Sequence, residues 1–346
     1  EAVAQQDEER QTQAQLGGGT VSLTLDYTLK GGGTLSRQYS LWVVPDQADQ
    51  EGTAAWALQR ICDNRELYWR VYTFDHLEEL LAQLDELCGL DKVKKDVKSL
   101  INLVKVRKLR EEAGLPVPPM SLHLVFMGNP GTGKTTVARL LAKIYHAVGV
   151  LSQGQLVEVD RSGLVAGFVG QTALKTQEAV QKAIGGVLFI DEAYALVNAD
   201  NANDFGHEAI EVILKNMEDH RKDLIVIVAG YTDRMEQFIH ANPGLESRFN
   251  KYFFFEDYDG KQLMEIFRSM CKKNGYTLSE EGETFMEKDL QELYDSRDEN
   301  FGNARDVRNL FEQAVARQAD RVSQLEEPTK EQLMELRPED LEEKPE

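Results

Sequence analysis

Short apolar runs alternate with helical segments along most of the chain. Segments such as TVARLLAKIYHAVG carry apolar residues at helical spacing and lie between the runs. Because parallel strands need crossover helices, this alternation predicts an α/β domain over residues 84–257 with a five-stranded parallel sheet. The expected strands are each rich in β-branched or aromatic residues: LHLVFMG (122–128), QLVEVD (155–160), GVLFID (186–191), DLIVIVAGY (223–231) and KYFFFED (251–257).

After residue 257 the apolar spacing is helical throughout. Three segments, GKQLMEIFRSMCKKNG, SEEGETFMEKDLQELYDSR and NARDVRNLFEQAVARQADRV, are punctuated by Gly and Asn. They predict a small helical domain over residues 258–322. Residues 323–346 are acidic and interrupted by proline, a composition that predicts a loosely ordered tail.

The N-terminal part follows a different pattern. Residues 1–19 are rich in Gln and Glu and end in GGG, which predicts a flexible tail. VSLTLDYTL and TLSRQYSLWVV then alternate apolar and polar residues around three glycines, as in a β-hairpin with one buried face. Since residues 53–84 show a helical pattern, residues 20–83 are predicted to form a small α+β module of unknown role.

Composition narrows the classes of function. The 346 residues are 42% hydrophobic and 28% charged, as in a soluble globular protein. A formal charge of −20 disfavours nucleic acid as the main partner, since phosphate-backbone binding needs clustered Lys and Arg. The three cysteines Cys62, Cys88 and Cys271 form no C-x-x-C pair, so we expect no disulfide framework and a reducing cytoplasm. The apolar runs are too short for a membrane span and no signal peptide is visible, so no membrane partner is expected.

The octapeptide GNPGTGKT, residues 128–135, matches the phosphate-binding loop G-x-x-x-x-G-K-[ST] at every fixed position. It lies between an expected strand and an expected helix, which is the context that this motif requires. Glycines let backbone N–H groups wrap a phosphate, Lys134 supplies a charge to the β- and γ-phosphates, and the Thr135 hydroxyl can bind Mg²⁺. The motif predicts a nucleoside triphosphate and Mg²⁺ as ligands. The expected nucleotide-binding residues here are Asn129, Pro130, Gly131, Thr132, Gly133, Lys134, Thr135 and Thr136.

A pair of acids ends the third expected strand. Asp191 and Glu192 in GVLFIDEA lie at the carboxyl edge of the sheet, where open α/β sheets bind their ligands. Asp191 can hold Mg²⁺ through its water shell, and Glu192 can orient and deprotonate the attacking water. In isolation such a pair is also typical of a helix N-terminus, but downstream of a phosphate loop we interpret it as catalytic.

The order of motifs from about Leu84 to Val322 resembles AAA+ ATPases, specifically the branch that contains stage V sporulation protein K and the red-type rubisco activases. CGLDKVK, GNPGTGKT, SGLVAGFVGQTALKT, FIDEAYAL, NPGLESRFN and FGNARDVRNL carry this resemblance. It implies a P-loop AAA+ fold whose helical domain forms a lid, with ATP hydrolysis as the reaction. The N-terminal module lies outside it.

The resemblance also implies roles for single residues. Gly89 and Leu90 would lie beside the adenine, and Arg248 would be the arginine finger that reaches the neighbouring subunit's site. Arg305 resembles the second sensor, and Arg308 is the alternative. For either arginine, a salt bridge without any role in nucleotide sensing is the competing explanation. At the position of the first sensor, where the family usually has Asn, this chain has Tyr231 followed by Thr232. Either hydroxyl could hold the attacking water.

Phe168, Val169 and Gly170 occupy the place where AAA+ remodellers carry an aromatic pore loop. An aromatic beside a flexible Gly can grip an extended polypeptide through apolar contacts, although a Phe packed under a loop is the simpler explanation. Residues 199–206 are a weaker candidate for a second pore element. The expected protein is thus a homo-oligomeric ring, a hexamer, that remodels or threads an unknown protein substrate. The alternatives are an ATP-gated scaffold or switch and, less favoured, a DNA-directed loader.

Overall fold

The computed structural model describes residues 77–118, 120–168, 170–197, 205–298 and 301–342, together with the backbone of three strands nearer the N-terminus. By its internal contacts the chain divides into two compact units, residues 1–72 and 73–346. In the described part, no helix combines the length and the apolar character needed to cross a membrane.

The three strands of the N-terminal unit form an antiparallel sheet in the order β1–β2–β3. Strands β2 (Thr20–Thr28) and β3 (Thr34–Trp42) form the hairpin that the alternating pattern predicted, paired from Thr20 opposite Trp42 to Thr28 opposite Thr34. The flexible tail predicted for residues 1–19 is wrong for residues 10–17, which form strand β1 (Arg10–Gly17) paired with β2. Main-chain pairing does not depend on apolar side chains, so the polar composition did not reveal this strand. Of the predicted helix over 53–84, residues 77–85 are helical and 53–76 lie outside the described residues.

The larger unit is built on the predicted five-stranded parallel sheet. Its strand order, β5–β6–β7–β4–β8, brings the first and fourth predicted strands side by side, and every pairing is parallel. The carboxyl ends of all five strands therefore share one edge. The strands are β4 (Leu124–Gly128), β5 (Leu156–Val159), β6 (Val187–Ile190), β7 (Ile225–Gly230) and β8 (Tyr252–Phe255).

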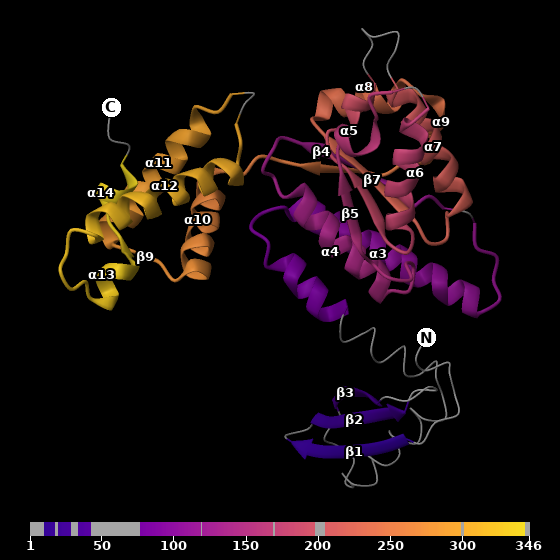
Figure 1. The fold of residues 1–346 in the computed structure, drawn as a ribbon, viewed down its shortest axis with the longest axis horizontal. Helices are drawn as coiled ribbons and strands as arrows, with labels where there is room; N and C mark the ends of the chain where they lie inside the picture. The colour runs from indigo at the N-terminus through magenta and orange to yellow at the C-terminus, as the bar shows by residue number, and fades with distance from the viewer. Residues whose placement is uncertain are drawn as a thin grey trace. The chain divides into compact units, whose positions relative to one another are not determined.

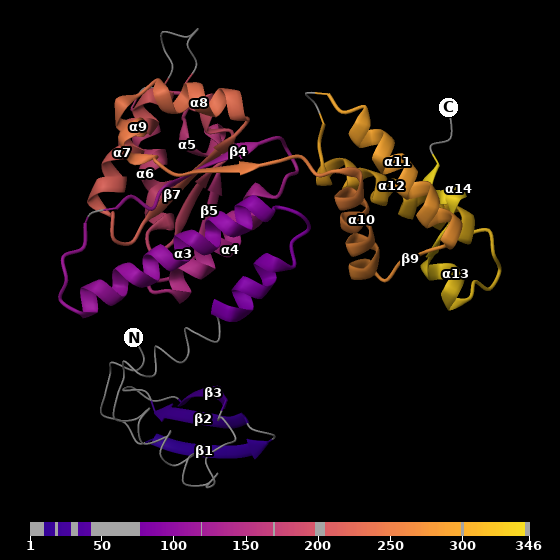
Figure 2. The same ribbon diagram turned by 180° about the vertical axis from the view of Figure 1, so that it is seen from behind.

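Helices cover both faces of this sheet, as continuous apolar strands require (Figure 1). One face, seen again in Figure 2, packs against the segment 77–84 and against helices α3 (Asp91–Glu112) and α4 (Lys134–Ala147). Successive residues of a strand alternate between the faces, so Phe126 joins this core and Met127 the opposite one. The opposite face is covered by α5 (Arg161–Leu164), α6 (Thr172–Ala183), η2 (Ala193–Leu196), α7 (Gly206–Asp219), α8 (Thr232–His240) and α9 (Pro243–Arg248).

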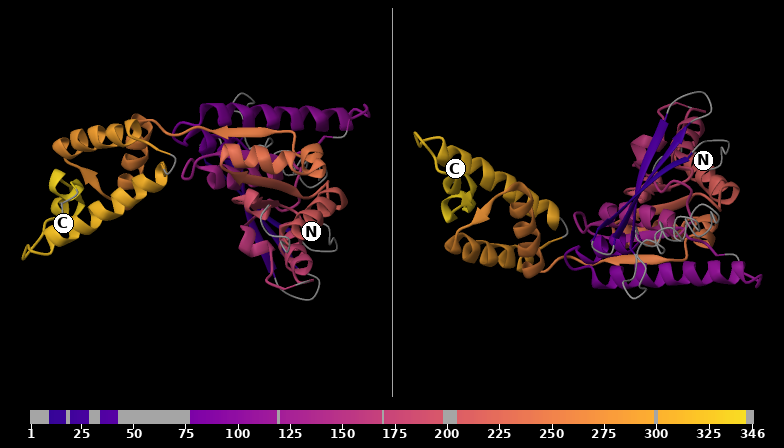
Figure 3. Two further views of the ribbon diagram at one scale, coloured as in Figure 1. Left: turned by 90° about the horizontal axis from the view of Figure 1, so that it is seen from above. Right: turned by 90° about the horizontal axis from the view of Figure 1, so that it is seen from below.

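The predicted helical domain is present (Figure 3). It has its own apolar core. Its three long helices coincide with the three predicted segments: α10 (Gly260–Asn274), α11 (Glu280–Asp295) and α12 (Ala304–Val322). Asp259 begins α10 with a capping box, and Gly275 ends it in the left-handed conformation.

The loosely ordered acidic tail predicted for residues 323–346 is wrong for the described residues 323–342. Here α13 (Lys330–Met334), β10 (Glu335–Leu336) and α14 (Pro338–Leu341) pack into the helical domain, and β10 pairs in parallel with β9 (Thr277–Leu278). Two leucines, Leu336 and Leu341, are buried in its core. Asp340 is 1% exposed and is neutralised by Arg321, which explains how an acidic segment can dock.

Candidate active site

The phosphate loop connects β4 to α4 in a conformation that depends on glycine. Gly131 and Gly133 have φ angles of +71° and +91°, in the left-handed region. A Cβ on Gly131 would lie 2.0 Å from the carbonyl oxygen of Gly302, so this turn also touches the start of the helical domain. Thr132 is fully buried and donates its hydroxyl proton to the Asn129 carbonyl at 2.8 Å, which closes the loop on itself.

Lys134 lies inside this loop. Its Nζ donates to the carbonyl oxygens of Gly128 at 2.8 Å and Asn129 at 2.7 Å. Burial lowers the pKa of the ammonium to about 8, while the nearby carboxylate of Asp191 acts in the opposite direction. A phosphate at the loop would therefore meet a cation that is desolvated and that, within the described part of the chain, donates to two neutral acceptors.

The two acids follow β6 at the carboxyl edge of the sheet. Asp191 Oδ1 accepts the backbone N–H of Glu192 at 3.0 Å. Glu192 itself has φ 47° and ψ 42°, a left-handed conformation that is uncommon for a residue with a side chain. Such strain is concentrated at functional sites, and here it turns the chain between β6 and η2.

A cavity of 970 Å³ collects most of the predicted nucleotide site. Of the predicted residues, the walls include Gly89, Leu90, Pro130, Gly131, Gly133, Lys134, Thr135, Thr136, Asp191, Glu192, Tyr231 and Arg305. Three predicted residues are not among those that line it, Asn129, Thr132 and Thr232. The first two turn their side chains to other partners, and Thr232 is the first residue of α8.

Several walls of the cavity were not predicted. Helix α10 contributes Ile266 and Met270, one turn apart on one face, and Tyr258 closes the cavity beside the phosphate loop. The Tyr258 hydroxyl donates to the Thr132 carbonyl at 3.2 Å, and burial raises the pKa of this phenol. The i, i+4 apolar spacing on α10 was visible in the sequence, but nothing there separates a cavity wall from a core face.

Arg305 and Arg308 both line the cavity from the first turns of α12. Both therefore remain candidates for the second sensor. Arg305 is close enough to oppose the charge on Lys134 and lower its pKa. Among the described residues, neither arginine forms an ion pair within 4.0 Å, which removes support for the plain salt-bridge explanation.

Arg248 is not among the residues that line the cavity of its own subunit. It ends α9, where its Nη2 lies 3.8 Å from Glu218 Oε2 and its Nη1 donates to the Gly244 carbonyl at 3.3 Å. Its Nε is buried without a partner among the described residues. The guanidinium is thus only loosely held where it is.

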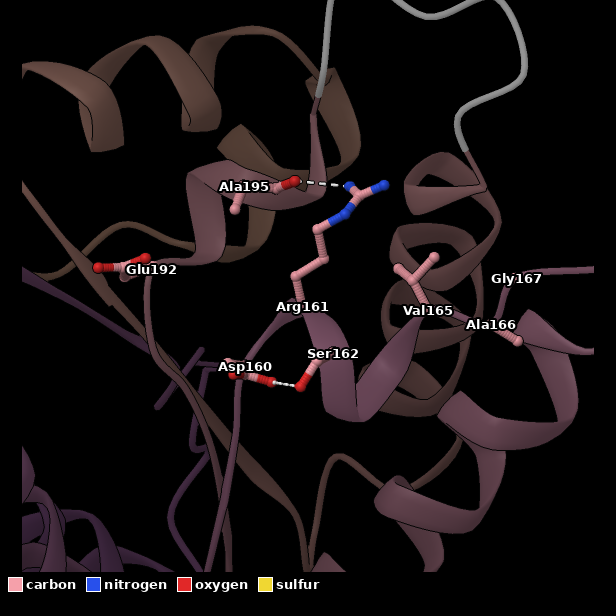
Figure 4. Close-up of a pocket in the computed structure, with 8 residues that line it drawn as sticks. All are labelled: Asp160, Arg161, Ser162, Val165, Ala166, Gly167, Glu192 and Ala195. Atoms are coloured by element: carbon pink, nitrogen blue, oxygen red, sulfur yellow. Dashed lines mark hydrogen bonds between the residues drawn. The ribbon is translucent and has the colours of Figure 1, made fainter.

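A second, smaller cavity of 490 Å³ lies beside Glu192 (Figure 4). Glu192 is shared with the large cavity, and the opposite wall is formed by residues 165–167, which precede Phe168. Arg161 donates to the Ala195 carbonyl at 2.6 Å across it, and Ser162 donates to Asp160 at 2.6 Å. Phe168 itself is 73% exposed and is not a packed core residue; Gly170 has a φ of +77° with open space around it. Val169 and residues 199–204 lie outside the described residues.

Phosphate loop, acid pair and helical lid on a parallel sheet define the class of protein. Residues 124–257 match the model of the ATPase family associated with various cellular activities (AAA), and residues 259–346 match the AAA lid domain. The chain therefore belongs to the AAA ATPase family and is an ATP-binding, ATP-hydrolysing enzyme. The lid match also includes the residues predicted as a tail.

Within this family the chain is similar to a group of curated relatives. It is 44% identical to the CfxQ homolog of Galdieria sulphuraria over 275 residues, 78% of this chain and 89% of that protein. It is 41% identical to stage V sporulation protein K of Bacillus subtilis, over 77% of this chain and 82% of that protein. It is 42% identical to the chloroplastic ribulose bisphosphate carboxylase/oxygenase activase of Cyanidioschyzon merolae, over 71% of this chain and 84% of that protein.

The crystal structure of the FIGL-1 AAA domain with ADP shares the fold, with a TM-score of 0.52 and 17% identity. That match covers 74% of this chain and 80% of the FIGL-1 chain.

Proposed function

We propose that this protein is a Mg²⁺-dependent ATPase that works as a hexameric ring and remodels or threads a protein partner through a pore lined by Phe168. The observation that carries the proposal is the position of Arg248. A full hydrolytic set lines the cavity, yet the arginine expected to act on the γ-phosphate is absent from the cavity's walls. A site of this kind is completed by a second copy of the chain, as in other ATPases with an arginine supplied in trans.

Roles in hydrolysis follow from the positions of the side chains. Lys134 would neutralise the β- and γ-phosphates, and Glu192 would take the proton of the attacking water. Thr135 and Asp191 line the same cavity and offer the oxygen ligands that Mg²⁺ prefers, so both fit a metal that would neutralise phosphate charge. Tyr231 lines the cavity and Thr232 does not, which favours Tyr231 as the first sensor.

Coupling to a protein partner is supported by Glu192, which borders both cavities. The small cavity lies between this acid and the base of the segment that carries Phe168. A change at the nucleotide could therefore reach the exposed aromatic through one short, incompletely packed region. The relative named as a ribulose bisphosphate carboxylase/oxygenase activase makes a protein substrate the favoured class, whereas the name of the sporulation relative points to no particular substrate.

We place the protein in the cytoplasm, supported by the free thiols of Cys88 and Cys271. An ATP-gated scaffold is the second candidate, favoured by the compact N-terminal unit, which stands outside the family models. The scaffold function differs from the threading function because it requires assembly of the ring but no role for Phe168.

A complementation assay tests the shared site. Arg248→Ala and Glu192→Gln should each abolish ATP hydrolysis, a loss of 10³–10⁵ in rate or about 4–7 kcal/mol for the arginine. Mixed one to one, the variants should regain about a quarter of wild-type activity. At about one interface in four, a subunit with an intact Glu192 meets a neighbour with an intact Arg248. Activity per subunit of the wild type should also rise with protein concentration. A mixture that stays inactive, or a dilute chain that is already fully active, would refute the shared site.

A second assay separates threading from scaffolding. Phe168→Ala should keep basal ATP hydrolysis and lose activity on the partner protein, because the exposed ring lies outside the nucleotide cavity. The candidate partner for the assay is an inhibited ribulose bisphosphate carboxylase/oxygenase. Full activity of the variant on a partner that the wild type remodels would rule out the pore role and leave the scaffold function.

A further inference from the structure

Asn303 is a fully buried polar residue at the junction of the phosphate loop and the lid. It precedes α12 and has φ 54° and ψ −126°, a backbone region that is almost restricted to glycine. An asparagine kept in such a conformation has a side chain that the structure needs, since glycine would fit the backbone without strain.

The side chain of Asn303 connects three segments. Its Oδ1 accepts the backbone N–H of Tyr258 at 2.9 Å, and its Nδ2 donates to Asp257 Oδ1 at 2.8 Å and to the Pro130 carbonyl at 3.3 Å. Asp257 in turn accepts both hydrogen bonds of the Asn129 amide, at 3.0 and 3.1 Å. The nitrogen and the oxygen of the Asn303 amide are thereby both used on the phosphate loop and on the link between β8 and α10.

Backbone contacts reinforce this connection. The N–H of Ala304 donates to the Gly131 carbonyl at 3.3 Å, and Gly131 packs against Gly302 so closely that no Cβ would fit. Residues 257–258 lead from β8 into α10, and residues 302–304 lead into α12 within the lid. The starts of two lid helices therefore meet the phosphate loop at Asn303. The loop cannot change its shape without changing the hydrogen bonds that orient the lid.

We infer that Asn303 is a positioning residue that transmits nucleotide occupancy of the phosphate loop to the lid, with Asp257 as its partner. It acts through Asn129, Pro130 and Asp257 and does not line the nucleotide cavity. The inference rests on the proposed nucleotide site, and it does not depend on the ring or on the protein substrate.

Hydrogen–deuterium exchange with a non-hydrolysable ATP analogue and Mg²⁺ tests this role. In the wild type the analogue should slow exchange in both 129–136 and 302–308. In Asn303→Gly, which suits the backbone, protection of 129–136 should remain and protection of 302–308 should be lost. Steady-state kinetics should show kcat about tenfold lower with KM changed less than about threefold, the signature of lost coupling.

A charge swap provides a sharper variant. Asn303→Asp alone places a second carboxylate against Asp257 and should lose coupling more severely than Asn303→Gly. The double variant Asn303→Asp with Asp257→Asn restores a donor opposite a carboxylate but leaves the Pro130 carbonyl without its donor, so part of the lost kcat and of the 302–308 protection should return. Asn216→Asp is the matched control, because Asn216 is a buried amide paired with Gln177 on α6, away from the cavity. Asn216→Asp should lower thermal stability. In the folded molecules, the protection of 129–136 and of 302–308 by the analogue should be unchanged.

The outcomes separate the possible failures. If the wild type itself shows no protection of 129–136, the proposed nucleotide site fails. If the wild type shows both protections and Asn303→Gly keeps both, the site stands and the role of Asn303 is wrong. A variant that only melts at a lower temperature, with coupling intact, would also overturn the inference.

Discussion

Replacing Asp340 by asparagine should weaken the packing of the C-terminal segment against the rest of the lid. Asp340 is almost fully buried and forms two hydrogen bonds with Arg321, from Nε to Oδ1 at 2.9 Å and from Nη2 to Oδ2 at 2.7 Å. It also accepts the backbone N–H of Arg337 at 2.9 Å, which begins α14. The substitution keeps the shape and removes the charge, so Arg321 loses its buried counter-charge.

The expected cost can be worked out from these contacts. Removing one partner of a buried ion pair costs about 3–5 kcal/mol when the other is left unpaired. Arg321 is partly exposed and has Glu339 at 3.4 Å, and asparagine can still accept one hydrogen bond, so we expect about 2–3 kcal/mol. Glu339→Gln is the matched control, because this carboxylate faces the same arginine from an exposed position and should contribute about 0–1 kcal/mol.

Amide exchange is the appropriate assay, because none of the three tryptophans Trp42, Trp56 and Trp69 belongs to the lid sequence. The Ser279 N–H donates to the Leu336 carbonyl across the β9–β10 pair. Its exchange should accelerate roughly 30- to 150-fold in Asp340→Asn and less than about fivefold in Glu339→Gln. Equal acceleration in the two variants, or none in either, would refute the account of how this acidic segment docks.

Three further predictions concern pH, the phosphate loop and metal. Burial, with Arg248 and Lys251 adding to it, lowers the pKa of His123 to about 4, so the unfolded chain takes up the proton first as pH falls. Unfolding free energy from urea titrations should drop by about 2 kcal/mol between pH 7 and pH 5, and less in His123→Asn. Gly131→Ala should weaken ATP binding at least about tenfold by calorimetry, whereas Gly114→Ala, with a similar φ of +68° and open space, should not. Chelation of Mg²⁺ should abolish hydrolysis until the metal is restored, with Thr135→Val requiring more metal for half-maximal rate.

Local signals in the sequence determined the elements of the α/β domain. Each buried strand is a continuous apolar run between turn residues, and the phosphate loop has four fixed residues within eight positions. Such features depend only on neighbours in the chain, so they could be predicted from the sequence. The order of the strands in the sheet could not. The acid pair after β6 was located in the same way, since its place follows from where the strand ends.

Long-range partners account for what the sequence could not predict. Residues 323–342 have few apolar positions, and their docking depends on Arg321 of α12, which no local pattern connects to Asp340. The walls contributed by Ile266 and Met270 belong to a cavity only because α10 approaches a phosphate loop more than a hundred residues earlier. Asn303 lies in the segment FGNARDVRNL two residues before Arg305, and its own contacts appear only in three dimensions.

The loose setting of Arg248 has a thermodynamic consequence for the proposed ring. In its own subunit the guanidinium makes one ion pair at 3.8 Å and one hydrogen bond at 3.3 Å, and leaves a buried Nε without a partner among the described residues. A phosphate of a neighbouring site would offer stronger, charge-assisted hydrogen bonds. ATP that gains such contacts must favour assembly by the same free energy by which assembly favours ATP. The affinity of the wild type for ATP should therefore fall on dilution, while that of Arg248→Ala should not depend on protein concentration.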